Sequence, residues 1–416
     1  AALLARGLEL TPDGWAYWES GVSLLTGHGY AYFGGQPIRA FPPLFSLLVA
    51  GFSAALGVSG LTLIVLLAAL AAASGYAWTR LYAALAGAGQ AGGPWPLLFA
   101  LYVALSVAGW SQALLADTLG LALLGATLFP LARLCATPPA AAGPGAAFRG
   151  RDALGLALGL TALLLTRNAA LAFVAAAAVV ALVCVGGSWR RLAVLVATAA
   201  PVAAAWYAQA RLGQTHAHAL GAGLAPFTPA DYLWQLATGL AELFAHPLLG
   251  AGSWAAAAVA VAAFGWALAR VRPGAPAGSR ATLALAATAL LATAALYAMF
   301  NLTRVHDALR GRFLWHLPLV LTGTLAVALS GPATGWARRW AGAAMVLLVL
   351  LQAGLVGVEL CRVWTGARVP DVLPMDTIRP GHVDAPPVAA GRLRIVSPPT
   401  YPWIVRHPRG APLAPR

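Results

Sequence analysis

Long apolar runs separated by short arginine-containing segments constrain the fold of this chain more than any other feature. Several of these runs approach the roughly 20 residues that an α-helix needs to cross a bilayer. Of the 416 residues, 60% are hydrophobic and only 9% are charged, which leaves too few polar side chains to cover a soluble body. The sequence therefore predicts an all-α, polytopic transmembrane bundle with about 10–12 spanning helices.

The basic residues orient this predicted bundle. All 26 are arginine, and together they give a net charge of +14. Most lie between apolar runs, so we expect them to meet membrane lipids and we expect no nucleic-acid partner. If the run 41–57 does not cross, alternate loops carry the arginines, and the positive-inside rule places those loops in the cytoplasm. They hold Arg80, Arg133, Arg149, Arg151, Arg190, Arg191, Arg270, Arg272, Arg280, Arg338 and Arg339.

The remaining loops then gather the unusual polar residues on the external side of a plasma (inner) membrane. This orientation predicts a membrane domain over 1–361, with external loops at 11–46 and 211–252, and an external Pro- and Arg-rich tail at 362–416. Ionisable groups near hydrocarbon mark a substrate path or a paired structural site. Those on this side include Asp13, Glu19, Asp117, Arg167, Asp231, His306, Asp307, Arg310 and Arg312.

The stretch 11–46 contains two of the twelve acidic residues, Asp13 and Glu19, among Trp, Tyr, Gly and Pro. A carboxylate here could act as a general base, and arginines on the same side could bind phosphate through bidentate hydrogen bonds. Structural roles are the alternatives: a helix N-cap for Asp13, a cap or interhelical hydrogen bond for Asp117, and snorkelling to the lipid headgroups for Arg167.

Four segments follow one another along roughly the first 330 residues: DGWAYWESGVSLLTGHGY with FPPLFSLLVA, then SQALLADTLGLALL, LLLTRNAAL and RGRFLWHLPLVL. Their order resembles the polytopic GT-C glycosyltransferase superfamily, and within it the group similar to protein O-mannosyltransferases and lipid A aminoarabinose transferases. The chain departs from that pattern where Gly14, Phe41 and Phe313 replace an acidic residue, a His or Arg, and a Tyr.

The resemblance implies an inverting transfer of a sugar from a polyprenyl-phosphate donor to an acceptor at the external or periplasmic face. It implies that Asp13 acts as base or as a ligand of a divalent metal, so the cofactor stays open. Asp117 and Glu19 are the further catalytic candidates. The candidates for substrate binding are Tyr17, Tyr30, Arg167, His306, Arg310 and Arg312.

Two other functional classes fit the same composition. A lipid or sugar transporter would also have many spans, but we find no internal repeat, and the polar residues gather at one face rather than at the midplane. A noncatalytic membrane subunit of a larger complex would explain the Pro- and Arg-rich tail. The sequence does not identify the donor sugar or the acceptor. The chain starts without Met or a signal-peptide pattern, so we expect residues upstream of it.

Overall fold

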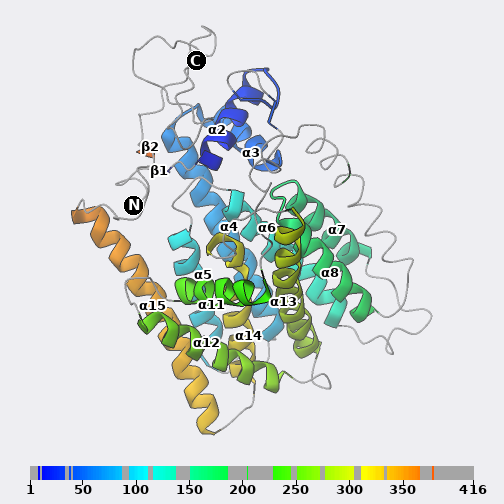
Figure 1. Ribbon diagram of the computed structural model, residues 1–416, viewed down its shortest axis with the longest axis vertical. Helices are drawn as coiled ribbons and strands as arrows, with labels where there is room; N and C mark the ends of the chain where they lie inside the picture. The colour runs from blue at the N-terminus through cyan, green and yellow to red at the C-terminus, as the bar shows by residue number, and fades with distance from the viewer. Residues whose placement is uncertain are drawn as a thin grey trace.

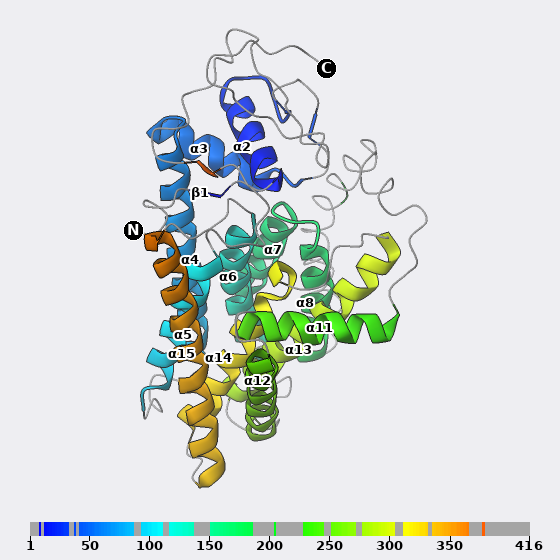
Figure 2. The same ribbon diagram turned by 60° about the vertical axis from the view of Figure 1, so that its left-hand side comes forward.

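The computed structural model is a bundle of helices with a smaller helical layer at one end (Figures 1 and 2). It describes residues 8–9, 12–32, 37–38, 41–86, 93–110, 116–136, 150–185, 204, 228–244, 251–271, 277–303, 311–331, 335–365 and 377–378.

Five of the described helices are long and apolar enough to cross a membrane. They are α4 (Gly60–Ala86), α6 (Ala116–Ala136), α12 (Ala251–Arg270), α13 (Ala277–Thr303) and α15 (Trp336–Thr365). Four shorter apolar helices accompany them: α3 (Leu44–Leu56), α5 (Trp95–Trp110), α8 (Ala170–Val185) and α14 (His316–Ser330).

The remaining elements are α2 (Pro12–Leu25), α7 (Gly150–Leu164), α11 (Pro229–Phe244), the short 3-10 helix η3 (Gly311–Leu314), and the two-residue strands β1 (Leu8–Glu9) and β2 (Thr377–Ile378). The strands pair antiparallel, with Leu8 opposite Ile378. The prediction of an all-α polytopic bundle is confirmed. The apolar run 192–207 in the sequence predicts a further span, but it lies outside the described residues apart from Ala204, so the total number of spans stays a prediction.

The polar residues Thr166, Arg167 and Asn168 predict a break in the apolar run 154–185, and the run divides into two helices there. Helix α7 ends at Leu164 and α8 begins at Ala170. Between them the chain turns, with the Arg167 amide donating to the Leu163 carbonyl oxygen at 3.0 Å. A single helix over this run would be too long for one crossing, and the turn between the two helices carries Arg167.

Helix α3 is too short to cross a bilayer by itself. Its 13 residues rise about 20 Å, against roughly 30 Å of hydrocarbon. It packs on α2 at the end of the bundle that is uppermost in Figure 1. This geometry fits the alternative in which the run 41–57 does not span the membrane, on which the predicted orientation depends.

Helices α2 and α3 approach each other closely because Gly21 has no side chain. A Cβ at Gly21 would lie 2.6 Å from Val49 Cγ1. Beside this contact the Ser20 hydroxyl lies 2.7 Å from that of Ser46. The pair of helices buries Tyr17, Trp18 and Phe45 in a separate apolar cluster over the ends of α4 and α6.

Helices α4 and α6 run parallel and are joined by hydrogen bonds between them. Ser74 Oγ donates to the Thr118 carbonyl oxygen at 3.1 Å, and Trp78 Nε1 donates to that of Leu121 at 3.0 Å. Within hydrocarbon such bonds satisfy groups that water cannot reach. These bonds fix the position of α6 along α4, and with it the position of Asp117, which lies in the first turn of α6.

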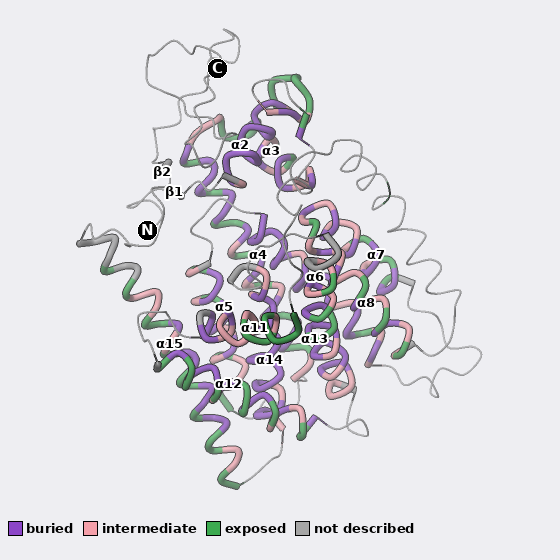
Figure 3. The backbone as a smooth tube through the Cα atoms, viewed as in Figure 1, coloured by how far each residue is buried: buried purple, intermediate pink, exposed green. Residues whose placement is uncertain are grey.

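The outer sides of the long helices are apolar and exposed, as Figure 3 shows along α12 and α15. Leu350 on α15 is 62% exposed and Val183 on α8 is 76% exposed. A soluble protein rarely leaves contiguous apolar patches of this kind uncovered. The arrangement is that of a bundle whose outer surface meets lipid.

Candidate functional site

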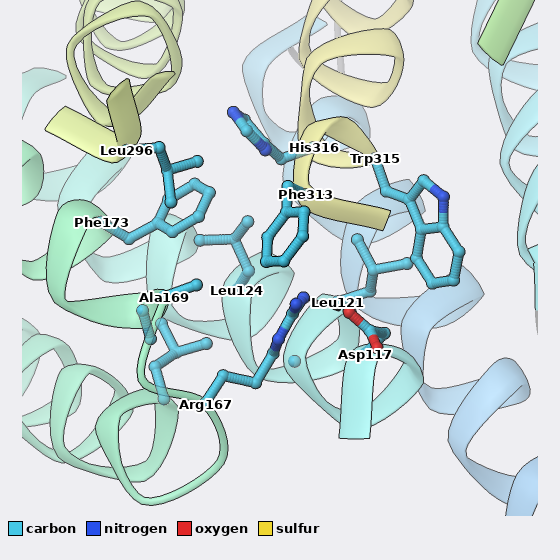
Figure 4. A pocket seen from close by; sticks show the side chains of 13 residues that line it. Asp117, Leu121, Leu124, Arg167, Ala169, Phe173, Leu296, Phe313, Trp315 and His316 are labelled. Atoms are coloured by element: carbon cyan, nitrogen blue, oxygen red, sulfur yellow. Dashed lines mark ion pairs between the residues drawn. The ribbon is translucent and has the colours of Figure 1, made fainter. Parts of the chain in front are cut away.

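An ion pair between Asp117 and Arg167 forms the centre of the site. The Arg167 guanidinium contacts Asp117 Oδ1, and the two side chains are 20% and 3% exposed respectively. The Phe313 ring lies on the guanidinium, with 5.3 Å from Cζ to the ring centroid. Figure 4 shows the Arg167 side chain between Asp117 and Phe313. Asp117 is almost completely shielded from water and Arg167 largely so, so the stability of the pair depends on close contact between the two charged groups.

Three separate parts of the chain bring these residues together. Asp117 comes from the start of α6, Arg167 from the turn between α7 and α8, and Phe313 from η3. The start of α3 is joined to the same place, since the Leu44 amide donates to the Leu165 carbonyl oxygen at 2.9 Å. The start of α3 therefore lies directly against the turn that carries Arg167.

The pair borders a cavity of about 40 Å³, which would hold about three water molecules. One end of the cavity is charged, and the rest of its wall is mostly apolar, with His316 as a further polar residue. Its lining includes Leu121, Leu124, Leu163, Phe173, Leu296 and Trp315. A space of this size suits a small group such as a phosphate.

His316 forms part of the wall and is fixed by its neighbours. Its Nε2 lies 3.1 Å from Thr293 Oγ1, whose own hydrogen goes to the Ala289 carbonyl oxygen at 2.8 Å. Since that hydroxyl has one hydrogen to give, Nε2 is the donor to Thr293. The Phe173 ring packs edge-on against the imidazole, with 4.6 Å between centroids. His316 thus joins α14 to α13 behind the cavity.

Helix α2 lies over this site and brings Asp13 toward it. Asp13 is partly buried in the first turn of α2, and Tyr17, one turn later, is buried. Burial raises the pKa of Tyr17, the carboxylates of Asp13 and Asp117 raise it further, and Arg167 opposes them. The Tyr17 hydroxyl is therefore within electrostatic range of both carboxylates and of the guanidinium. Asp117 and Arg167 line the cavity, whereas Asp13 and Tyr17 lie outside its lining, and the roles of all four residues stay predictions.

The other candidates of the first loop lie further along the same layer. Glu19 is 1% exposed. The Tyr30 hydroxyl donates to the Phe41 carbonyl oxygen at 2.8 Å, which holds the loop against the start of α3. Burial raises the pKa of Tyr32 to about 12, and the charges of Glu19 and Asp13 add to that rise. Glu19 and Asp13 thus act electrostatically on a common neighbour.

Three substrate-binding candidates are not placed by the structure. His306 and Arg310 lie outside the described residues, and for Arg312 only the backbone of η3 is described. Among the described residues, no three His, Cys, Asp or Glu side chains form a group that could hold a metal ion. The described part of the chain therefore offers no set of three such ligands for the metal that the family resemblance suggests.

Sequence reasoning missed the residues that shape the cavity. Phe313 stood out only as a departure from the family pattern, and His316 and Phe173 were not singled out. The signal available for His316 was a histidine at the start of an apolar run. Nothing in the sequence alone shows that Phe173, in the first turn of α8, packs against His316.

The fold is that of a polytopic membrane protein built from helices. No known family model and no curated protein matches the sequence. Among solved structures, the chain is similar to ArnT from Cupriavidus metallidurans, in a crystal structure bound to undecaprenyl phosphate. The TM-score is 0.50 and the identity 18%, over 90% of this chain and 63% of the ArnT chain. The likeness confirms the GT-C-like fold, and this chain matches less than two thirds of that protein.

Proposed function

We propose that this protein is an inverting membrane glycosyltransferase that moves a sugar from a polyprenyl-phosphate donor to an acceptor hydroxyl. The observation that supports this most is Arg167, held at the charged end of a phosphate-sized cavity by Asp117 and Phe313. Undecaprenyl phosphate, bound in the ArnT crystal structure, is a lipid phosphate of the class that such a cavity would suit.

In this proposal Arg167 binds the phosphate of the donor. Its guanidinium presents a planar set of donors, and Asp117 and Phe313 restrict its orientation. Asp117 then acts chiefly by positioning Arg167, and so contributes to catalysis without meeting the acceptor. The sugar and the acceptor would lie toward Asp13, Tyr17 and Tyr30 in the layer formed by α2.

The chemical step is a displacement at the anomeric carbon of the sugar. Asp13 accepts the proton of the acceptor hydroxyl, the acceptor oxygen forms the new bond to the carbon, and the bond to the phosphate oxygen breaks. Polyprenyl phosphate leaves with the electron pair, and its charge is met by Arg167. Attack opposite the leaving group inverts the anomeric configuration.

The same proposal places the site on the external face of the plasma membrane. The support is that successive connections between helices alternate: one set carries most of the arginines, and the other set carries Asp13, Asp117 and Arg167. The external segments would include α11, which lies across the bundle beside η3 (Figure 2).

A reconstitution assay tests the proposal. The protein in liposomes receives polyprenyl-phosphate-linked sugars and membrane extract as the acceptor source, and release of polyprenyl phosphate is measured. We expect Asp13→Asn to lower turnover about 10²- to 10⁴-fold, the range for removal of a general base. Asp231→Asn, which changes an exposed carboxylate at the start of α11, is the matched control and should retain turnover. Unchanged turnover in Asp13→Asn, with normal thermal stability, would remove Asp13 from the mechanism.

A further inference from the structure

Two of the three cysteines of the chain, Cys135 and Cys184, lie on helices that contact each other. Cys135 is in the last turn of α6 and is 3% exposed. Cys184 is in the last turn of α8 and is partly exposed. The proposed function uses neither side chain, and Cys184 follows Cys135 by 49 positions in the chain, so their proximity is a product of the fold.

Helices α6 and α8 both have cavity-lining residues near their starts, so both run away from the cavity. Leu124 of α6 and Phe173 of α8 belong to that lining (Figure 4). Cys135 follows Leu124 by eleven residues, and Cys184 follows Phe173 by the same number. Eleven residues make about three turns and about 16 Å of α-helix. Each cysteine therefore lies at a similar distance from the cavity, on the same face of its helix as the lining residue.

A row of packed side chains connects the cavity to each cysteine. On both helices these residues recur at the fourth, seventh and eleventh positions after the lining residue, which is the spacing of one helix face. The two rows pack in one apolar cluster and consist of Leu124, Leu128, Leu131 and Cys135, and of Phe173, Ala177, Val180 and Cys184. At the ends of these matching rows the two thiol groups are close enough to share a hydrogen bond.

The two thiols differ in their access to reagents. Cys135 is buried, whereas Cys184 is partly exposed one residue before the end of α8. Arg133, two residues before Cys135, is 54% exposed, which places this turn at the polar boundary of the bundle. A reagent in water can therefore reach Cys184 before Cys135. An accessible thiol with a second thiol beside it is the arrangement of redox-sensing cysteines.

We propose that Cys135 and Cys184 form a redox-active dithiol, which a small disulfide such as oxidised glutathione converts to an internal disulfide. The Cys184 thiolate attacks one sulfur of the oxidant, whose S–S bond breaks, and the first thiolate leaves. The Cys135 thiolate then attacks the Cys184 sulfur in the mixed disulfide, and the second thiolate leaves. The protein gives up two electrons and two protons, and the oxidant becomes two thiols.

The new bond would join α6 to α8 about three turns from the cavity that both helices line. In the orientation proposed above, this end faces the cytoplasm, where thiols are kept reduced. The dithiol is then the resting form, and the disulfide forms when the compartment becomes oxidising. This inference does not depend on the proposed transferase activity.

Oxidation of the whole protein with oxidised glutathione tests the proposal. Cys361→Ser removes the exposed cysteine of α15 and gives a starting protein that keeps only the pair. After oxidation, we expect both thiols to be lost to maleimide labelling under denaturing conditions, and peptide mass spectrometry to find Cys135 joined to Cys184. Dithiothreitol should restore both thiols. The oxidised protein should unfold about 4 to 8 °C higher, because the bond closes a long loop.

Two matched variants in the same background separate the roles of the two thiols. With Cys135→Ser, Cys184 should keep one glutathione as a stable mixed disulfide, and Cys135→Ala takes its place if the buried hydroxyl prevents folding. With Cys184→Ser, the buried Cys135 should stay unmodified. Neither variant should gain thermal stability on oxidation. A starting protein that keeps both thiols free, or that keeps glutathione on Cys184 beside an unreacted Cys135, would overturn the proposal.

Discussion

The two ends of this bundle each contain an ion pair, and the arginines of the two pairs differ in exposure. At the cavity end, Asp117 is 3% exposed and Arg167 is 20% exposed, and they face each other inside the protein. At the other end, the acidic partner Asp152 is also buried at 9% exposed, but Arg133 is 54% exposed. A buried charge is stable only when an oppositely charged group lies in close contact with it, whereas an exposed charge is also stabilised by water and lipid headgroups. In the proposed function, the buried pair serves the ligand, and the exposed arginine serves the orientation in the membrane.

The largest effect is expected from breaking the buried pair. Asp117→Ala should lower the free energy of unfolding by about 3 to 5 kcal/mol, because it leaves the Arg167 guanidinium without its carboxylate. Asp152→Ala at the opposite end should cost about 1 kcal/mol or less, since Arg133 remains solvated. Thermal unfolding of both variants in the same detergent measures the difference. Equal losses would show that the two ends do not differ in the way described.

The next effect concerns the layer that covers the site. Gly21→Ala should destabilise the protein by about 1 to 3 kcal/mol, because its Cβ would meet Val49 at 2.6 Å and push α2 away from α3. Gly51→Ala is the control, since a Cβ there meets nothing within 4 Å. It should leave stability unchanged or raise it by up to about 1 kcal/mol through helix propensity. If the two variants have the same unfolding temperature, α2 and α3 do not approach each other at Gly21 as closely as described.

A smaller effect should follow from loosening the contact between α4 and α6. Trp78→Phe removes the donor to the Leu121 carbonyl oxygen while keeping an aromatic ring, and should cost about 1 to 2 kcal/mol. The comparison variant is Trp336→Phe at the exposed end, where the ring has no such buried neighbour and the cost should be near zero. Chemical or thermal unfolding of the pair gives the answer, and a larger loss in Trp336→Phe would contradict it.

The smallest effect is a pH dependence at the start of α11. The Thr228 hydroxyl and amide donate to the Asp231 carboxylate at 2.7 and 2.9 Å and hold its pKa below the usual value. Because the folded pKa is lowered, the stabilisation is present above pH 4 or so and is lost as the pH falls through the folded pKa. Asp231→Asn should therefore unfold slightly more easily at neutral pH, and the difference should vanish in acid. A difference that grows on acidification would contradict this cap.

Sequence reasoning was most successful where a local pattern has a direct physical cause. Apolar runs of spanning length predicted the bundle, and Thr166, Arg167 and Asn168 predicted the break between α7 and α8. The shortness of α3 was visible from the prolines at 42 and 43 and from Gly57, whose φ of +84° ends the helix. These features act within a few residues, so one sequence is enough to find them.

The candidate site was predicted only in part, because its geometry is made by distant segments. Asp13, Asp117 and Arg167 were each noticed as charges in an apolar chain, and the predicted orientation placed them at one face. That Asp117 holds Arg167, and that Phe313 covers it, depends on packing among α6, α7, α8 and η3. No spacing in the sequence contains that information, and the roles of these residues stay proposals.

The most direct test of the central claim, that Arg167 binds a lipid phosphate, is the affinity of the protein for polyprenyl phosphate. Binding to the purified protein is compared with binding of the uncharged polyprenol, in the natural protein and in Arg167→Gln. The account predicts that the natural protein prefers the phosphate, and that Arg167→Gln loses about 10- to 150-fold of the affinity for it while keeping that for polyprenol. An unchanged affinity for the phosphate in a folded Arg167→Gln protein would contradict it.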